Sequence, residues 1–483
     1  MTPASQPSAQ PTHLIAGERY LGTGGRTFDI ADPATGERAA TVPVAGASDV
    51  DAAVSAAAKA AAGWAKTSPA ERAAAVRSAA QRCRAEADQL AELTVREMGK
   101  PIEDARGGVA AGLATLEQYA ELGPVHRGTS LQGGFAATDL MVHEPRGVVA
   151  VVTPWNDPVA VPCGLLGAAL VTGNTVVFKP SERAPLTGAR LAELLAAELP
   201  TGVLNAVLGD GETGAALAAH SDVALIAHVG STATGRSIAA AAARTGAKVL
   251  LENGGKDPMI VDSDVDPAWA AEQAALGCFA NAGQICTAVE RVYVHADVAE
   301  PFLAALVKRA EALVAGPGLD PATTLGPLVD RRQRDVVDGH VREAVAAGAR
   351  VLTGGAVPDG PGSFYPATVL ADCTDEMQIM RDETFGPVAP VCVVDSFDEG
   401  LARAAASSYG LAAVVLTADM EHAQRAWREL PAGTVKINAV FGGAPGGAAE
   451  PHRGSGHGFG YGPELLDEMA TTKVVHLTVP QRR

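Results

Sequence analysis

From residue 148 onward, short apolar runs alternate with helical stretches. The first runs are rich in β-branched residues and lie at 148–153, 175–179, 204–208, 224–229, 248–251 and 259–261. A second set follows at 290–295, 391–394, 413–416 and 434–437. Continuous apolar strands separated by helices are typical of a parallel sheet that is covered on both faces. The pattern predicts an α/β fold with two doubly wound parallel-sheet domains.

The first third of the chain carries helical patterns with recognisable start signals. Ser48 and Asp51 open an alanine-rich run to Trp64, and Ser68-Pro-Ala-Glu71 opens a longer run that closes at Gly99. Both starts have the form of a capping box, in which a Ser and an acid three residues later satisfy free backbone N–H groups. We therefore expect two long surface helices.

Length and charge narrow the class of protein. At about 150 residues per domain, 483 residues predict roughly three domains. The formal charge of −17 repels phosphate backbones and anionic headgroups, so nucleic acid and membrane surfaces are poor candidate partners. The most apolar stretch, 147–173, is broken by prolines and polar residues and does not predict a membrane span.

Terminal and cysteine patterns predict a cytoplasmic protein. Residues 1–12 lack the basic start and apolar run of a signal peptide, and we expect a disordered tail there. The six cysteines form no Cys-x-x-Cys pair and are too sparse for a disulfide scaffold. Reduced thiols are therefore expected, and no metal site is predicted.

Two glycine-rich segments follow predicted strands and precede predicted helices. Gly209-Asp-Gly211-Glu-Thr-Gly214 has the spacing of a dinucleotide fingerprint, but the acid expected about 20 residues later is missing, so a tight turn explains it equally well. Gly230-Ser-Thr-Ala-Thr-Gly235 places free N–H groups and a helix dipole where a pyrophosphate would bind. Neither segment is specific by itself.

Five further motifs occur in a fixed order. They are Thr153-Pro-Trp-Asn156, Phe178-Lys-Pro-Ser-Glu182, Leu251-Glu-Asn-Gly-Gly-Lys256, Asn281-Ala-Gly-Gln-Ile-Cys286 and Glu383-Thr-Phe-Gly-Pro387. Each alone has a structural explanation, such as a packed thiol or a strand-end turn. Together, in this order and spacing, they resemble the NAD(P)-dependent aldehyde dehydrogenase superfamily over nearly the whole chain.

The resemblance implies a catalytic set of Cys286, Glu252 and Asn156. Cys286 would attack an aldehyde to give a thiohemiacetal, and hydride transfer to nicotinamide would leave a thioester. The Asn156 amide and the backbone N–H of Cys286 would stabilise the oxyanion. Glu252 would activate the water that hydrolyses the thioester, with burial raising its pKa toward neutrality.

The resemblance also implies a dinucleotide site. Its residues are Thr153, Trp155, Lys179, Glu182, Gly211, Gly230, Ser231, Glu383 and Phe385. Lys179 and Glu182 would lie at the adenine ribose, Gly230 and Ser231 near the pyrophosphate, and Glu383 with Phe385 at the nicotinamide ribose. A carboxylate at position 182 repels a 2′-phosphate, so NAD is expected, with NADP as the less favoured cofactor.

The chain departs from the family pattern around the expected substrate tunnel, to which we assign Asp157, Gly164, Ile285, Thr287 and Ala449. An aromatic residue is usual where Asp157 stands, and residues 448–453 replace a usual Pro-Phe-Gly-Gly segment. We expect a roomier, more polar tunnel in which Asp157 and Glu450 meet a hydroxyl or amino group. Alternatively, Asp157 pairs with His452 or Arg453 and only holds the rebuilt loop.

Another departure is Gly460, where the family usually has a glutamate; its absence puts in doubt a proton relay through that position.

The family's organisation implies three parts. They are a Rossmann-like dinucleotide-binding domain at 13–124 and 147–252, a catalytic domain at 253–440, and a small β-ribbon with the C-terminal segment at 125–146 and 441–483. The alternating apolar strand 473–479 suits pairing with another subunit. A homodimer or homotetramer is expected, with a small-molecule aldehyde as substrate.

The sequence alone also leaves other functions open. A coenzyme A-acylating dehydrogenase shares the first half-reaction, although Glu252 argues against it because acylating members typically lack that base. A cysteine hydrolase or esterase without redox chemistry would need a histidine partner for Cys286, which the sequence does not reveal. A non-catalytic descendant is disfavoured because Asn156, Glu252 and Cys286 are all present.

Overall fold

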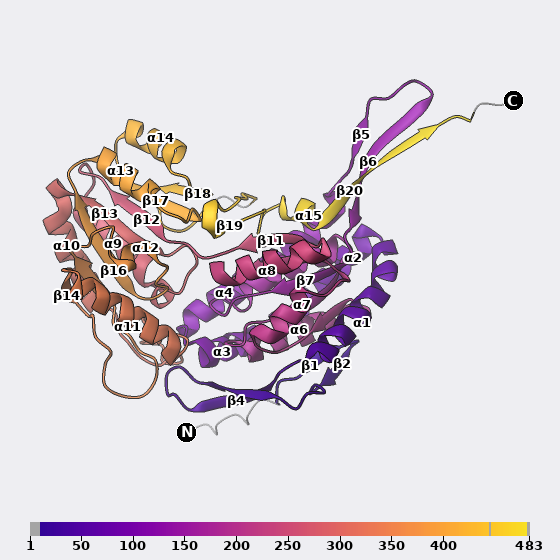
Figure 1. Cartoon of the computed structure of the whole chain (residues 1–483), viewed down its shortest axis with the longest axis horizontal. Helices are drawn as coiled ribbons and strands as arrows, with labels where there is room; N and C mark the ends of the chain where they lie inside the picture. The colour runs from indigo at the N-terminus through magenta and orange to yellow at the C-terminus, as the bar shows by residue number, and fades with distance from the viewer. Residues whose placement is uncertain (1–9, 444–445, 481–483) are drawn as a thin grey trace.

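The computed structural model, which describes residues 10–443 and 446–480, has two α/β lobes and a projecting ribbon (Figure 1). Most of the predicted tail at 1–12 lies outside the described residues, but Pro11 is buried against the first lobe. The predicted fold class is confirmed: two parallel sheets and a small antiparallel sheet.

The first lobe contains an eight-stranded sheet in the order β19-β11-β10-β7-β8-β9-β1-β2. Its five central strands are parallel, and the apolar runs predicted between residues 148 and 251 form them. Their bounds are β7 (Val148–Val152), β8 (Thr175–Lys179), β9 (Leu204–Ala206), β10 (Val223–Val229) and β11 (Lys248–Glu252). The connecting helices are α5 (Ala160–Val171), α6 (Pro185–Ala196), α7 (Gly211–Ala218) and α8 (Thr232–Thr245).

Short strands extend this lobe at both edges, and the hydrophobic pattern did not predict them. The added strands are β1 (His13–Ile15) and β2 (Glu18–Tyr20) at one edge and β19 (Gly456–His457) at the other. A separate hairpin consists of β3 (Thr27–Ala31) and β4 (Arg38–Pro43). The C-terminal segment therefore contributes β19 to the first sheet as well as a strand to the ribbon.

Four helices, rather than two, occupy the region before the ribbon. They are α1 (Ala47–Lys66), α2 (Pro69–Ala85), α3 (Ala87–Met98) and α4 (Ile102–Leu122). The capping box at Ser68 is confirmed, because the Ser68 hydroxyl and the Glu71 carboxylate bond each other's backbone N–H. The predicted start at Ser48 is wrong: α1 begins after Gly46, whose N–H donates to Asp49 Oδ2 at 2.9 Å.

The second lobe contains a seven-stranded sheet in the order β14-β15-β16-β13-β12-β17-β18. All neighbours are parallel except β14 and β15. The strands are β12 (Asp257–Val261), β13 (Val289–His295), β14 (Arg350–Thr353), β15 (Thr368–Ala371), β16 (Val388–Val394), β17 (Ala412–Leu416) and β18 (Thr434–Ile437). The helices are α9 (Pro267–Phe279), α10 (Ala296–Glu311), α11 (Arg331–Ala346), α12 (Gln378–Arg381), α13 (Phe397–Ala405) and α14 (Met420–Glu429), with the 3₁₀ turn η2 (Ala280–Gly283).

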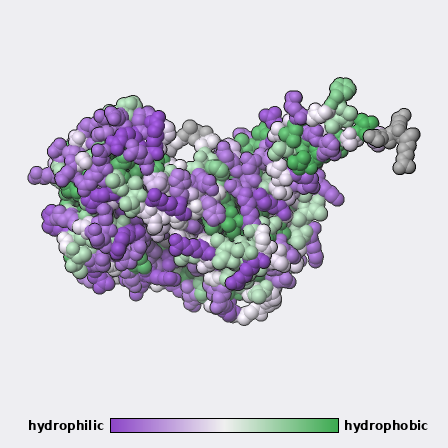
Figure 2. All heavy atoms as spheres, turned by 45° about the horizontal axis from the view of Figure 1, so that its top comes forward, coloured by the Kyte–Doolittle hydropathy of each residue, from purple (hydrophilic) through white to green (hydrophobic). Residues whose placement is uncertain are grey.

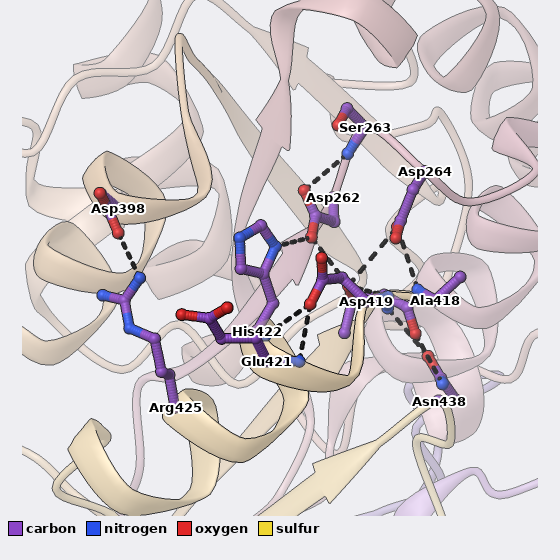
Figure 3. Close-up of polar contacts among 11 residues, drawn as sticks. Asp262, Ser263, Asp264, Asp398, Ala418, Asp419, Glu421, His422, Arg425 and Asn438 are labelled. Atoms are coloured by element: carbon purple, nitrogen blue, oxygen red, sulfur yellow. Dashed lines mark hydrogen bonds and ion pairs between the residues drawn. The ribbon is translucent and has the colours of Figure 1, made fainter.

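A polar cluster holds together the carboxyl ends of β12 and β17 (Figure 3). Asp262 Oδ2 lies 2.5 Å from His422 Nδ1 and accepts from Thr417 Oγ1 at 2.8 Å. The His422 ring stacks on Phe397 at 3.9 Å, and Asp419 caps the start of α14. The stacked pair of Phe397 and His422 packs α13 against α14.

The ribbon is an antiparallel sheet of β5 (Thr129–Leu131), β6 (Ala137–Pro145) and β20 (Ala470–Thr478), in the order β20-β6-β5. It joins the first lobe through η1 (Gly123–Val125), α15 (Leu465–Glu468) and the connection to β7; the remaining turn is η3 (Arg453–Ser455). The predicted strand at 473–479 falls on β20, which pairs with β6 on one side only. Apolar side chains lie exposed along it (Figure 2), among them Val474 and Leu477.

Among the described residues, no helix is both long and apolar enough to cross a bilayer.

Candidate active site

A cavity of about 800 Å³ lies between the two lobes. Its walls come from the carboxyl ends of β7, β8 and β10, from α7 and α8, and from α11 and two loops of the second lobe. Ligands of open α/β sheets bind outside the carboxyl ends of the strands. Eleven predicted site residues line it: Thr153, Trp155, Asn156, Lys179, Glu182, Gly211, Gly230, Ser231, Cys286, Glu383 and Phe385.

Cys286 stands on a tightly wound loop between α9 and β13. Asn281, Ala282 and Gly283 all have positive φ, at 50°, 55° and 71°. A Cβ on Gly283 would lie 2.1 Å from the carbonyl oxygen of Gly386, so only glycine allows the two loops to pack this closely. Non-glycine residues held at positive φ store backbone strain, which collects at functional sites. The strained loop places the thiol on the cavity wall.

In the protein alone, the surroundings of Cys286 favour the thiol over the thiolate. The side chain is exposed to the cavity, whereas the other five cysteines are buried. Enclosure by protein nevertheless raises the pKa of the Cys286 thiol to about 12, and the negative charge of Glu252 adds to the shift. Cys286 is therefore a thiol at neutral pH that is accessible to a small substrate and requires a proton acceptor.

Asn156 is buried and fixed beside the cysteine loop. Its Nδ2 donates to the carbonyl oxygen of Gln284 at 3.1 Å, and Asn281 Nδ2 donates to the same oxygen at 3.0 Å. An amide nitrogen carries two hydrogens, so one N–H of Asn156 remains for a ligand. In the described part of the chain, the backbone N–H of Cys286 also donates to no protein acceptor. Both groups suit an oxyanion site.

Glu252 ends β11 and is enclosed by the C-terminal segment. Burial raises the pKa of its carboxyl group to about 8, while a hydrogen bond from the Gly460 N–H to Oε1, at 3.1 Å, opposes the shift. A Cβ at position 460 would lie 2.4 Å from Glu252 Cγ, so the glycine makes room for this arrangement of the side chain. Glu252 is thus tuned to exchange a proton near pH 8.

The glycines after Glu252 admit a second carboxylate. A Cβ on Gly254 would lie 2.4 Å from Glu383 Oε2, and the N–H of Gly255 donates to Glu383 Oε1 at 3.0 Å. Burial raises the pKa of Glu383 to about 8, with the charge of Glu290 adding to the shift. The Gly-Gly pair therefore positions Glu383 on the cavity wall.

The sequence analysis missed a buried ion pair that supports this wall. Lys256 Nζ lies 2.6 Å from Glu290 Oε2 and 3.1 Å from Thr384 Oγ1. Glu290 also accepts from the N–H groups of Thr384 and Phe385, each at 2.8 Å. The pair orders the loop that carries Glu383 and Phe385. A charged residue near the start of a strand rich in valine was the available signal, because a buried charge needs a partner.

The nucleotide side of the cavity combines a helix N-terminus, a cation and an aromatic pair. Ser231 caps α8 by accepting from the Thr234 N–H. Buried Lys179 lies 3.7 Å from the exposed carboxylate of Glu182, and burial lowers the pKa of Lys179. Trp155 and Phe385 meet edge to face, with centroids 5.3 Å apart.

These residues fit a dinucleotide. Thr153 Oγ1 is buried on the cavity wall and has no hydrogen-bond partner among the described residues, so a ligand hydroxyl or amide can supply one. His228, which the sequence analysis did not assign, also lines the cavity; burial lowers its pKa to about 4 and keeps the ring neutral. A neutral imidazole can donate or accept a hydrogen bond toward a ribose.

The partner of Asp157 is neither His452 nor Arg453. Its Oδ1 lies 2.9 Å from Nζ of the buried Lys100, at the start of α4. The alternative pairing with His452 or Arg453 is wrong, because the backbone of His452 bonds Gly410 and the Arg453 guanidinium bonds backbone carbonyls in the second lobe. The rebuilt loop is thus anchored without Asp157.

The other residues assigned to the tunnel lie outside the cavity lining. Ile285 and Thr287 flank Cys286 and are half-buried, as is Ala449. A Cβ on Gly164, in α5, would meet only Thr115 Cγ2 of α4, at 3.9 Å, so there is open space beside this glycine. Glu450 Oε1 accepts from the Gly458 N–H at 2.9 Å. Their contact with substrate remains a prediction.

The profile of the Aldehyde dehydrogenase family matches residues 20–475, nearly the whole chain. The chain belongs to the aldehyde dehydrogenase family. The resemblance stated from the five motifs is therefore confirmed, as is the assignment to an aldehyde-oxidising enzyme class.

Similar proteins agree with this membership. A betaine aldehyde dehydrogenase of Cereibacter sphaeroides is 40% identical over 439 residues, covering 90% of each chain. The NAD+ complex of an aldehyde dehydrogenase from Bacillus cereus is 36% identical, with a TM-score of 0.95 and 98% of each chain covered. A 3,6-anhydro-L-galactose dehydrogenase in complex with NADP is 35% identical, with a TM-score of 0.94, covering 97% of this chain and all of the other. This aldehyde dehydrogenase therefore uses a nicotinamide dinucleotide.

Proposed function

We propose that this aldehyde dehydrogenase oxidises a polar aldehyde to its carboxylate with NAD, through a covalent intermediate on Cys286. The observation that carries the proposal is the arrangement of three residues. Cys286 and Asn156 line one cavity, and Glu252 is near enough for its negative charge to raise the pKa of the Cys286 thiol. Purified protein should reduce NAD when supplied with a suitable aldehyde. Silence on a broad panel of aldehydes would contradict the proposal.

Each step has a residue with suitable properties. The Cys286 thiol loses its proton to solvent in the cavity as its sulfur attacks the aldehyde carbon, and the amide of Asn156 with the Cys286 N–H stabilises the resulting alkoxide. A nicotinamide held on the wall that carries Glu383 and Phe385 would supply the hydride acceptor, and loss of hydride from the thiohemiacetal carbon would leave a thioester on Cys286. Ionised Glu252 then takes a proton from water, whose oxygen attacks the thioester and releases the carboxylate and the thiol. The presence of this base at position 252 favours hydrolysis of the thioester over transfer of the acyl group to coenzyme A.

Replacing Asn156 with alanine should lower kcat by about 10²–10³-fold, since one fixed oxyanion donor is lost. The cavity wall formed by α8 and Lys179 is unchanged, so the dissociation constant for NAD should stay close to that of the unchanged enzyme. Steady-state kinetics and quenching of protein tryptophan fluorescence by NAD measure the two quantities. A variant that loses NAD binding and kcat together would indicate a structural role instead.

We propose a preference for NAD because Glu182 lies beside the buried Lys179. An ionised carboxylate accepts from ribose hydroxyls and repels a 2′-phosphate. Glu182→Gln should shift the ratio of kcat/KM for NAD over NADP toward NADP by at least about tenfold. Glu212→Gln, an exposed glutamate on α7 outside the cavity lining, is the matched control and should leave the ratio unchanged. Higher kcat/KM with NADP in the unchanged enzyme would overturn the preference.

We propose a hydroxylated or amino aldehyde as substrate, with Asp157 as the group that meets it. Lys100 pairs with one carboxylate oxygen of Asp157, whose side chain remains about a third exposed. The other oxygen is available to a ligand, although the cation weakens any preference for an ammonium group. Because a betaine aldehyde dehydrogenase is among the similar proteins, betaine aldehyde is a candidate substrate with a positive charge.

The panel should compare hydroxylated, amino, quaternary ammonium and aliphatic aldehydes. Asp157→Phe should lower kcat/KM for the polar aldehydes by about tenfold relative to aliphatic ones, the order of one lost hydrogen bond to a charged group. Asp157→Asn keeps the size of the side chain and removes its charge, which separates hydroxyl from ammonium recognition. An unchanged ranking in Asp157→Phe would reject this role.

We also propose a homodimer or homotetramer formed through the ribbon. The outer edge of β20 is unpaired within the described chain and carries exposed Val474 and Leu477. Such an edge is stabilised by pairing with another chain. Light scattering should give two or four times the 49.0 kDa chain mass, and a mass of one chain would contradict the proposal.

A further inference from the structure

Three side chains from separate segments converge at the base of the ribbon. His126 follows η1, His143 lies in β6, and Asp467 lies in α15. One ligand atom from each lies within 4.8 Å of the other two. This group, which we call the ribbon triad, shares no residue with the cavity lining.

The two imidazoles of the ribbon triad present the same edge to the carboxylate. Their rings stack with centroids 4.3 Å apart and planes inclined by 16°. His126 Nε2 lies 2.7 Å from Asp467 Oδ1, and His143 Nε2 lies 4.0 Å from the same oxygen. Both Nε2 atoms therefore lie within 4.0 Å of one carboxylate oxygen.

His143 is the residue that a simple structural role leaves unexplained. Its Nδ1 is buried without a partner among the described residues, and its Nε2 is too far from Asp467 for a hydrogen bond. A single His–Asp hydrogen bond needs only His126. A cation between Nε2 and the carboxylate would give the second imidazole a partner at Nε2, where the distance of 4.0 Å leaves no direct hydrogen bond.

We propose that the ribbon triad binds a divalent transition-metal ion of the Zn²⁺ class. Two imidazoles and one carboxylate are a common zinc ligand set, with bonds of about 2.0–2.2 Å and a fourth position for water. The Asp467 side chain is 64% exposed and can move to widen its short contact with His126. The two histidine side chains are 15% and 25% exposed and are already oriented.

The bound ion links the ribbon to the C-terminal segment. It would join β6 to the turn after η1 and to α15, which in its absence are linked by the His126–Asp467 hydrogen bond and by the pairing of β6 with β20. An ion that binds only the folded state raises the free energy of unfolding with the logarithm of the ion concentration once that exceeds the dissociation constant. Loading should therefore raise the melting temperature without a requirement for cofactor or aldehyde.

The test uses tag-free, full-length protein that carries Cys286→Ala, so that the exposed thiol does not bind metal. After treatment with a chelator, Zn²⁺ binding is measured by equilibrium dialysis, and Co²⁺ binding by its visible absorption. We expect one ion per chain, a ligand-field spectrum typical of four-coordinate Co²⁺, and a higher melting temperature with Zn²⁺.

Variants separate the site from adventitious binding. His143→Asn removes no hydrogen bond within the protein, yet it should weaken Zn²⁺ binding by at least about tenfold and abolish the thermal shift. Asp467→Asn, at an exposed position, should do the same. The matched control is His476→Asn on the same ribbon, since His476 pairs with Asp139 at 2.6 Å without a second histidine in the group. Absence of stoichiometric binding, or equal affinity in His143→Asn and the unchanged triad, would overturn the proposal.

Discussion

Replacing Cys286 with alanine should lower aldehyde oxidation by on the order of 10⁴-fold or more, because the covalent route loses its nucleophile. The side chain faces the cavity rather than a packed core, so the fold and the nucleotide wall should be retained. Steady-state NADH formation measures the loss, and NAD binding by fluorescence confirms that the nucleotide site is intact.

Cys392→Ala provides the matched control for this variant. Cys392 lies in β16, is 5% exposed and takes no part in the cavity. Its replacement should leave kcat within a small factor of the unchanged enzyme. Comparable activity of the Cys286→Ala and Cys392→Ala proteins would reject the assignment of the nucleophile.

Replacing Glu252 with glutamine should separate the two halves of the reaction. Acylation and hydride transfer need no base at the water, so a rapid burst of about one NADH per active site should remain. Steady-state turnover should fall by about 10²–10⁴-fold, the usual contribution of a general base. Rapid mixing with fluorescence detection of NADH distinguishes the burst from the steady state.

The pH dependence gives a second readout of Glu252. Burial raises the pKa of this carboxyl to about 8, and only the ionised form accepts a proton. Thioester hydrolysis should therefore increase as the pH rises through about 8 and lose this limb in Glu252→Gln. Glu300→Gln, an exposed change on α10, should keep both the turnover and the pH profile. Full turnover by Glu252→Gln would rule out the base.

The central strands could be predicted from the sequence because burial on both faces leaves a continuous apolar run. β8 and β18 coincide with the predicted ranges, and the neighbouring strands differ by a few residues at their ends. Short edge strands carry no such signal: β2 is exposed along its length, and β19 has two residues. The break between α2 and α3 at Glu86 also lacks the glycine or proline that marks a helix end.

The site could be predicted only as far as its motifs extend. Those motifs and the two glycine-rich segments named eleven of the cavity residues, but a motif does not show which distant side chain completes a pair. Asp157 and Lys100 are 57 positions apart, and Lys256 and Glu290 are 34 apart. The loop strain at Asn281 and the space that Gly460 leaves for Glu252 are likewise properties of packing.

The most direct test of the account is to trap the acyl-enzyme. Glu252→Gln protein is mixed with NAD and an aldehyde that the unchanged enzyme oxidises. The mixture is quenched in acid during the burst, and its peptides are analysed by mass spectrometry. The account predicts a mass increase equal to the acyl group on the peptide containing Cys286, in proportion to the NADH formed. NADH production without an adduct, or an adduct on another residue, would contradict it.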